Sequence, residues 1–176
     1  MPRRTDGKQF SLGDDGAGRH TLNLGTGRIS TAPPRWWSPM KGLTRDEVTP
    51  ANLARVFEQA FFRTRFNEDG GVSVHTDAGW VMILVGDENR FLRFMAIYDL
   101  RDDADDSAKL LLISRANMGS GFARFYLAHP TRLVADCDVP FDSDIPLRHM
   151  FETFRQFHCS VWSAMKTCDE DGIVAG

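Results

Sequence analysis

Three β-strand-like runs follow one another in the middle of the chain, and the turns between them are too short for parallel pairing. Val72–His75 alternates apolar and polar residues, Trp80–Val85 is apolar throughout, and Phe91–Asp99 alternates again. The turns Asp77–Gly79 and Gly86–Asn89 consist mostly of residues that favour tight turns. Parallel neighbours need a crossover of about a dozen residues or more. The sequence therefore predicts an antiparallel meander with Trp80–Val85 in a central position.

Helical patterns flank this meander. Thr49 followed by Pro50 is typical of a helix start, and apolar residues at helical spacing predict a helix over about Pro50–Arg63. The acidic loop Asp102–Asp106 can cap a second helix over about Ser107–Met118. The residues expected on the inner side of this second helix are Leu110, Leu111, Ile113, Ser114 and Asn117.

Two further strands and a long helix complete the pattern. Phe122–Ala128 and Leu133–Val139 are predicted strands, and a last helix begins within Asp142–Pro146 and reaches about Met165. The order α-β-β-β-α-β-β-α predicts an α+β fold. In this fold helices pack on an antiparallel sheet of about five strands.

Composition divides the chain into three parts. Residues 1–45 predict a poorly ordered, basic tail rich in Gly and Pro. Residues 46–166 contain the predicted α+β domain, and residues 167–176 form an acidic fringe that is expected to fray. Basic residues exceed acidic ones by five up to Arg45, whereas from Asp46 onward thirteen basic residues accompany twenty-one acidic ones, a balance of −8.

Two adjacent tryptophans, Trp36 and Trp37, stand among prolines in the tail. Burial of one such ring stabilises a contact by roughly 2–3 kcal/mol. The pair therefore either fastens the tail to the surface of the domain or forms a short recognition segment for a protein partner. A translation start at Met40 in place of Met1 would remove both rings.

The charge and the cysteines argue against several classes of protein. An acidic domain repels phosphate backbones, so we expect no nucleic-acid binding by the folded part. The longest apolar run, Trp80–Val85, is far shorter than the roughly 20 residues of a membrane helix, so no membrane association is expected. Three cysteines without C-x-x-C spacing and the lack of an N-terminal signal segment predict a cytoplasmic protein with free thiols.

The sequence lacks the residue spacing of a familiar active site. His158 and Cys159 are adjacent, so on a helix their side chains point about 100° apart. The loop Asp102–Asp106 lacks the glycine and the distal glutamate of an EF-hand calcium site. The Gly-rich segments near Gly13 and Gly25 follow no strand and precede no G-K-[ST] motif. We therefore expect no catalytic residues, no cofactor and no metal ion.

A longer pattern joins the second half of the predicted domain. A helix ends near Asn117, a strand then carries Phe122 and Arg124, and the next strand ends in Asp138-Val139-Pro140 before a long helix with spaced phenylalanines. Over about Asp46–Met165 this order resembles the YbjN family of proposed bacterial sensory transduction regulators. One departure is that Phe141–Asp144 replaces a glycine-bearing turn before the last helix.

The resemblance implies a fold similar to that of type III secretion chaperones, with no enzymatic activity and no catalytic residues to transfer. Asn117, Phe122, Arg124 and Asp138 are expected to be framework residues. Asn117 can bond exposed backbone at its helix end or on the neighbouring strand. Arg124 can pair with Asp136 or Asp138 across the hairpin.

Three functional hypotheses follow. The first is a non-catalytic regulatory module that binds another protein, with a homodimer as one version, because free sheet edges and an aromatic-rich helix suit strand addition or helix packing. The second is a small-molecule sensor that holds a metabolite between the sheet and the helices. The third is an enzyme that uses His129, His158 or Cys159.

Overall fold

A six-stranded antiparallel sheet forms the centre of the structure, a computed structural model in which residues 42–86 and 90–175 are described. The strands, in their order across the sheet, are β2 (Thr64–Phe66), β3 (Val72–Thr76), β4 (Gly79–Val85), β5 (Phe91–Asp99), β7 (Arg132–Pro140) and β6 (Arg124–His129). The predicted meander is β3-β4-β5, and its central strand is confirmed because β4 lies between β3 and β5. The α+β class and the predicted order are likewise confirmed, with one strand more in the sheet than expected.

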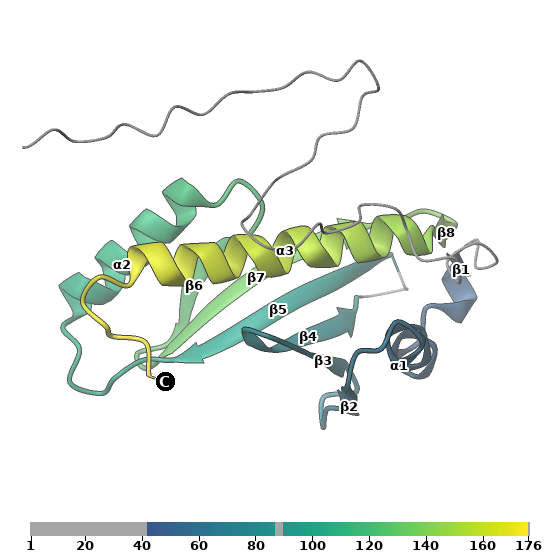
Figure 1. Ribbon diagram of the computed structural model, residues 1–176, viewed down its shortest axis with the longest axis horizontal. Helices are drawn as coiled ribbons and strands as arrows, with labels where there is room; N and C mark the ends of the chain where they lie inside the picture. Colours follow the sequence, from purple (N-terminus) through teal and green to yellow (C-terminus); the bar gives the residue numbers. More distant parts are fainter. Residues whose placement is uncertain (1–41, 87–89, 176) are drawn as a thin grey trace, which may run out of the picture. The chain divides into compact units, whose positions relative to one another are not determined.

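Three helices accompany the sheet: α1 (Pro50–Gln59), α2 (Asp106–Gly119) and α3 (Leu147–Cys168). Figure 1 shows α3 lying across one face of the sheet with α2 beside it. Two of the helix starts follow from their cap residues, as expected. Thr49 Oγ1 accepts a hydrogen bond from the Asn52 N–H at 3.3 Å, and Asp105 accepts one from the Ser107 N–H at 2.7 Å.

An aromatic cluster joins α1, α3 and the sheet. The ring of Phe57 is fully buried and lies 5.0 Å from that of Phe151 and 4.9 Å from that of Phe154, centroid to centroid. Phe154 in turn lies 5.5 Å from Phe94 of β5. Edge-to-face pairs of this kind contribute roughly 0.5–1.5 kcal/mol beyond the burial of the rings. The cluster therefore holds α1 and α3 on the same face of the sheet.

The first helix ends earlier than predicted. α1 stops at Gln59, and the stretch expected to continue it leads into β2 at Thr64. Phe61 has a φ of +66°, and the Phe62 N–H donates to the Phe57 carbonyl at 3.0 Å. A left-handed conformation costs a non-glycine residue about 1–2 kcal/mol. Helical periodicity does not reveal such a stop, because glycine is the usual residue there.

The predicted inner side of α2 is wrong in part. Its buried residues are Lys109, Leu112 and Ala116. Of the five residues predicted on the inner side, Ile113 is half-buried, and the other four are exposed, namely Leu110, Leu111, Ser114 and Asn117. Four consecutive apolar residues, 110–113, surround the helix, so their spacing does not select one face. Packing against α3 and β6 makes the choice.

Two short strands and a 3₁₀ helix lie where the sequence predicted no regular structure. β1 (Leu43–Thr44) pairs with β8 (Asp144–Ile145), and the 3₁₀ helix η2 (Arg45–Glu47) follows β1. Residues 42–45, which the sequence placed in the tail, therefore belong to the folded part, and α3 begins after β8 at Leu147. Strands of two residues carry no periodicity that a sequence could reveal.

Within the described residues the segment after α3 is bonded to the end of β5. The Arg101 N–H donates to the Ile173 carbonyl at 2.9 Å, and Leu100 pairs with Val174. Ile173 is buried. The described part of this segment after α3, residues 169–175, packs at the end of β5, where the Ile173 side chain is buried.

Candidate functional site

One face of the sheet carries no helix in the part of the chain that the structure describes (Figure 1). We call it the open face, and its central apolar residues are Trp80, Met82, Leu84, Met95 and Ile97. Met82 and Met95 are direct cross-strand partners. Ile97 is 42% exposed. The sequence placed β4 centrally because it is apolar on both sides, yet only its Val81 and Ile83 side is buried.

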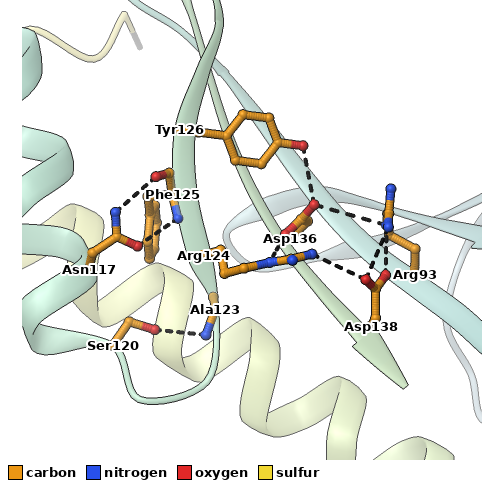
Figure 2. Close-up of polar contacts among 9 residues, drawn as sticks. All are labelled: Arg93, Asn117, Ser120, Ala123, Arg124, Phe125, Tyr126, Asp136 and Asp138. Atoms are coloured by element: carbon orange, nitrogen blue, oxygen red, sulfur yellow. Dashed lines mark hydrogen bonds and ion pairs between the residues drawn. The ribbon is translucent and has the colours of Figure 1, made fainter. Parts of the chain in front are cut away.

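A network of ion pairs borders the apolar stripe on β5, β6 and β7 (Figure 2). Arg124 donates from Nε to Asp136 Oδ1 at 2.9 Å and from Nη2 to Asp138 Oδ2 at 3.2 Å. Arg93 donates to both oxygens of Asp138, at 2.7 and 3.0 Å. Tyr126 Oη donates to Asp136 Oδ2 at 3.1 Å. The pairing expected for Arg124 is present, and it includes both aspartates.

Asp136 lies at the centre of this network, and its side chain is only 4% exposed. Burial, followed by the nearby Asp136 carboxylate, raises the pKa of Tyr126, which keeps its hydroxyl protonated as a donor. Arg93 was not foreseen, because its partner Asp138 comes from β7 and the pairing of β5 with β7 is not visible in the sequence. The ion pairs join the three strands β5, β6 and β7. Two arginines and two aspartates take part, so the network itself carries little net charge.

Stability is expected to fall in acid as Asp138 takes up a proton. Hydrogen bonds from Arg93 hold its pKa below the ordinary value of 3.8. A carboxyl with a lowered folded-state pKa stabilises the fold above its unfolded pKa, and this contribution is lost as the pH falls through the folded pKa. We expect the free energy of unfolding, measured with urea from about pH 6 to pH 2, to fall less steeply below about pH 4 in Asp138→Asn than in the unchanged protein. Equal slopes in the two proteins would contradict the assignment.

A second group of basic residues borders the stripe on the side of β2 and β3. The Arg65 guanidinium carbon lies 4.2 Å from the centroid of the Trp80 ring. The His75 ring meets the same indole edge to face at 4.9 Å. Arg63 Nη2 lies 3.0 Å from His75 Nδ1. Sequence reasoning missed this group, because it placed Arg63 at the end of the first helix and assigned Thr64–Phe66 to no strand.

The open face is basic relative to the domain that carries it. Among the described residues five of its side chains are arginines, namely Arg63, Arg65, Arg93, Arg124 and Arg132. They accompany three carboxylates, Asp99, Asp136 and Asp138, whereas the chain from Asp46 onward has twenty-one acidic residues and thirteen basic ones. The face therefore combines partly exposed apolar surface with a local excess of positive charge.

The outer edge of β6 is closed by α2. Asn117 Nδ2 donates to the Phe125 carbonyl at 2.9 Å, and the Phe125 N–H donates to Asn117 Oδ1 at 2.9 Å (Figure 2). The Ala123 N–H donates to Ser120 Oγ at 2.9 Å. These side chains satisfy backbone groups that a further strand would otherwise bond. Phe122 precedes β6 in the connecting loop, so it is not the first strand residue that the sequence predicted.

The residues considered for catalysis are not assembled into a recognised site. His158 is half-buried, Cys159 is exposed, and His129 contacts Thr131 in the β6–β7 turn. Burial raises the pKa of Cys137 to about 12, which disfavours the reactive thiolate. Within residues 42–86 and 90–175 no three His, Cys, Asp or Glu side chains are close enough together to hold a metal ion. None of the helices described has the length and apolar character that crossing a membrane requires.

A cavity between α3 and the sheet is small. It is lined by residues that include Val81, Ala96 and Val161, and its volume is about 140 Å³. Small-molecule sites usually measure about 300–1,000 Å³. Trp36 and Trp37, the predicted partner-binding residues, lie outside the described residues, so their prediction stays untested.

The fold is similar to a solved structure, whereas the sequence alone finds no relative. No protein-family model matches the chain, and no curated protein matches it by sequence. The crystal structure of YbjN, a proposed transcription regulator from E. coli, superposes with a TM-score of 0.59 at 12% sequence identity. The match covers 71% of this chain and 94% of that one. The expectation of a YbjN-like fold is therefore confirmed at the level of the fold.

Proposed function

We propose that this protein is a non-catalytic regulatory module, similar to YbjN, that binds another protein through the open face. The observation that carries the proposal is that one side of the sheet carries an apolar stripe of four half-buried side chains and the exposed Ile97, bordered by arginines. The fold similarity to a proposed transcription regulator and the residue pattern around Asn117–Asp138 support the regulatory part. The implied likeness to secretion chaperones agrees with a surface that holds another polypeptide.

The composition of the open face suits protein recognition. Tryptophan, tyrosine, methionine and arginine are the residues enriched in interfaces, and the open face contains all four in Trp80, Tyr126, Met95 and Arg65. Full burial of one exposed aliphatic side chain contributes roughly 1.5–3 kcal/mol. A few such contacts are enough for a specific complex.

Charge defines the chemistry of the expected partner. The open face carries two more arginines than carboxylates within an otherwise acidic domain. A partner that presents apolar side chains flanked by Asp or Glu complements it, and such complementarity raises the association rate and selects against basic surfaces. Strand addition at β6 is disfavoured, because Asn117 already occupies the outward groups of Phe125.

A matched pair of substitutions tests the surface. Ile97 on the open face is 42% exposed and Leu111 on α2 is 45% exposed, so Ile97→Asp and Leu111→Asp are similar changes on different surfaces. Ile97→Asp is expected to weaken capture of the partner at least about tenfold, whereas Leu111→Asp leaves it unchanged. Pull-down from lysate, quantified for each variant at low and high salt, measures both effects.

The same variants also detect two other modes of binding, through α2 and through a second copy of the chain. Loss of capture in Leu111→Asp alone would move the interface to α2 and overturn the assignment to the open face. Light scattering of the purified protein detects a second copy as the occupant, and dimerisation that Ile97→Asp abolishes would replace the acidic partner by self-association. Circular dichroism of each variant confirms that it is folded.

A further inference from the structure

Four basic residues line a cavity at the edge of the sheet beside α3, and two of them, Arg63 and His75, also border the open face. The volume of the cavity is about 400 Å³, within the usual range of about 300–1,000 Å³ for small-molecule sites. The basic residues are Arg63 between α1 and β2, His75 on β3, and Arg155 and His158 on α3. Asp77 is the only carboxylate among the residues found to line it. The cavity is therefore electropositive in an acidic domain.

Arg63 is held in place without a carboxylate partner among the described residues. Its Nη2 lies 3.0 Å from Nδ1 and 3.1 Å from Nε2 of His75. An approach in the ring plane at equal distance from both nitrogens would collide with the carbon between them, so Nη2 lies over the face of the imidazole. The His75 N–H also donates to the Arg63 carbonyl at 2.9 Å. The charge of Arg63 is thus positioned but not neutralised.

The pKa of His158 is sensitive to charge in the same cavity. Burial lowers the pKa of its imidazole, and the carboxylate of Asp77 partly opposes that shift. Asp77 lines the cavity together with Arg63 and Arg155, and its carboxylate favours the protonated ring. A bound anion would add to this effect and favour the imidazolium form.

The remaining walls are aromatic. Phe62 and Phe154 line the cavity together with Phe61, whose ring is 85% exposed. Phe61 holds the strained φ of +66° at a position where glycine is usual. Backbone strain of this kind clusters at ligand sites, since the side chain is retained at a cost to stability.

We propose that this cavity binds a small organic anion. Arg63 and Arg155 hold its carboxylate or phosphate group, and Phe61 and Phe62 contact its aromatic or aliphatic body. Arg63 and His75 border both surfaces, but Ile97 does not line the cavity. Ile97→Asp is therefore expected to bind the anion as the unchanged protein does, so that failure of one function leaves the other testable.

Calorimetry with three probes separates the parts of the ligand. Phenyl phosphate carries an anion and a ring, inorganic phosphate carries only the anion, and phenol carries only the ring. Phenyl phosphate is expected to bind at least about tenfold more tightly than either fragment. Absence of phenyl phosphate binding at millimolar concentration, or equal affinity for phenol, would overturn the proposal. Equal affinity for inorganic phosphate would overturn its aromatic part.

Substitutions on α3 and before β2 assign the binding to the cavity. Arg63→Gln and Arg155→Gln are each expected to weaken phenyl phosphate binding by about tenfold or more. Arg148→Gln, a change on α3 of a residue paired with Glu152, is the matched control and should leave affinity unchanged. In NMR titrations the His158 ring should protonate at higher pH when phenyl phosphate is bound. An equal loss in Arg148→Gln, or an unmoved His158, would refute the site.

Phe61→Gly tests whether the Phe61 ring contributes to ligand binding without contributing to the stability of the fold. Glycine adopts φ of +66° without strain, so the Tm is expected to stay equal or to rise. The affinity for phenyl phosphate should fall severalfold, because the ring that covers the ligand is lost. A lower Tm would show that the ring supports the fold, and an unchanged affinity would remove Phe61 from the site.

Discussion

Asp136→Ala is expected to lower the free energy of unfolding by about 3 kcal/mol. The buried carboxylate accepts hydrogen bonds from Arg124 and Tyr126 and lies 4.0 Å from Arg93 Nε. Its removal leaves two arginines with one carboxylate and a tyrosine hydroxyl without its acceptor. Removal of one partner from a buried pair costs about 3–5 kcal/mol, and we expect the lower end because the Arg124 side chain reaches water. Urea unfolding measures the change.

Asp138→Ala is the matched control for Asp136. It removes a carboxylate that contacts the same two arginines two residues further along β7, but the side chain of Asp138 is 34% exposed. Pairs near water contribute roughly 0.2–1 kcal/mol, so this variant should lose about 1 kcal/mol or less. Equal losses in the two variants would show that burial of Asp136 does not set its contribution.

Asn117→Ala is expected to lower the free energy of unfolding by about 2 kcal/mol. It removes two hydrogen bonds to the backbone of Phe125 and leaves an N–H and a carbonyl on the outer edge of β6. An unpaired strand edge is a template for pairing with another chain, so the variant should also self-associate more at high concentration. Thermal unfolding and light scattering measure the two effects.

Two controls isolate the role of the Asn117 amide. Ser114→Ala changes an exposed residue of α2 and reports the gain from alanine as a helix former. Asn117→Asp keeps an acceptor for the Phe125 N–H but loses the donor to its carbonyl, so it should retain part of the stability. A Tm of Asn117→Ala equal to that of Ser114→Ala would mean that the two bonds contribute nothing.

Much of the architecture could be predicted from local sequence. Short turns between alternating runs fixed the antiparallel meander, and Thr49 and Asp105 marked helix starts with their side chains. The prediction of secondary structure failed for very short strands, and the prediction of the buried side failed for a helix with apolar residues all round. β1 and β8 are two residues long, β2 is three, and the apolar run 110–113 gives α2 no preferred face.

The candidate sites depended far more on tertiary structure. Asp136 and Asp138 lie two apart on one strand, so the sequence could place them on the same face and pair them with Arg124. It could not supply Arg93, because that contact requires β7 to lie beside β5. The cavity lined by Arg63, His75 and Arg155 draws on three segments whose proximity follows only from packing.

The sequence by itself therefore determined the class of fold, its element order and the resemblance to YbjN, since periodicity, caps and turns act over a few residues. Only the tertiary structure decided which face of the sheet stays open, which edge Asn117 closes and which basic side chains meet. Those features depend on contacts between residues distant along the chain, and local patterns carry no record of such contacts.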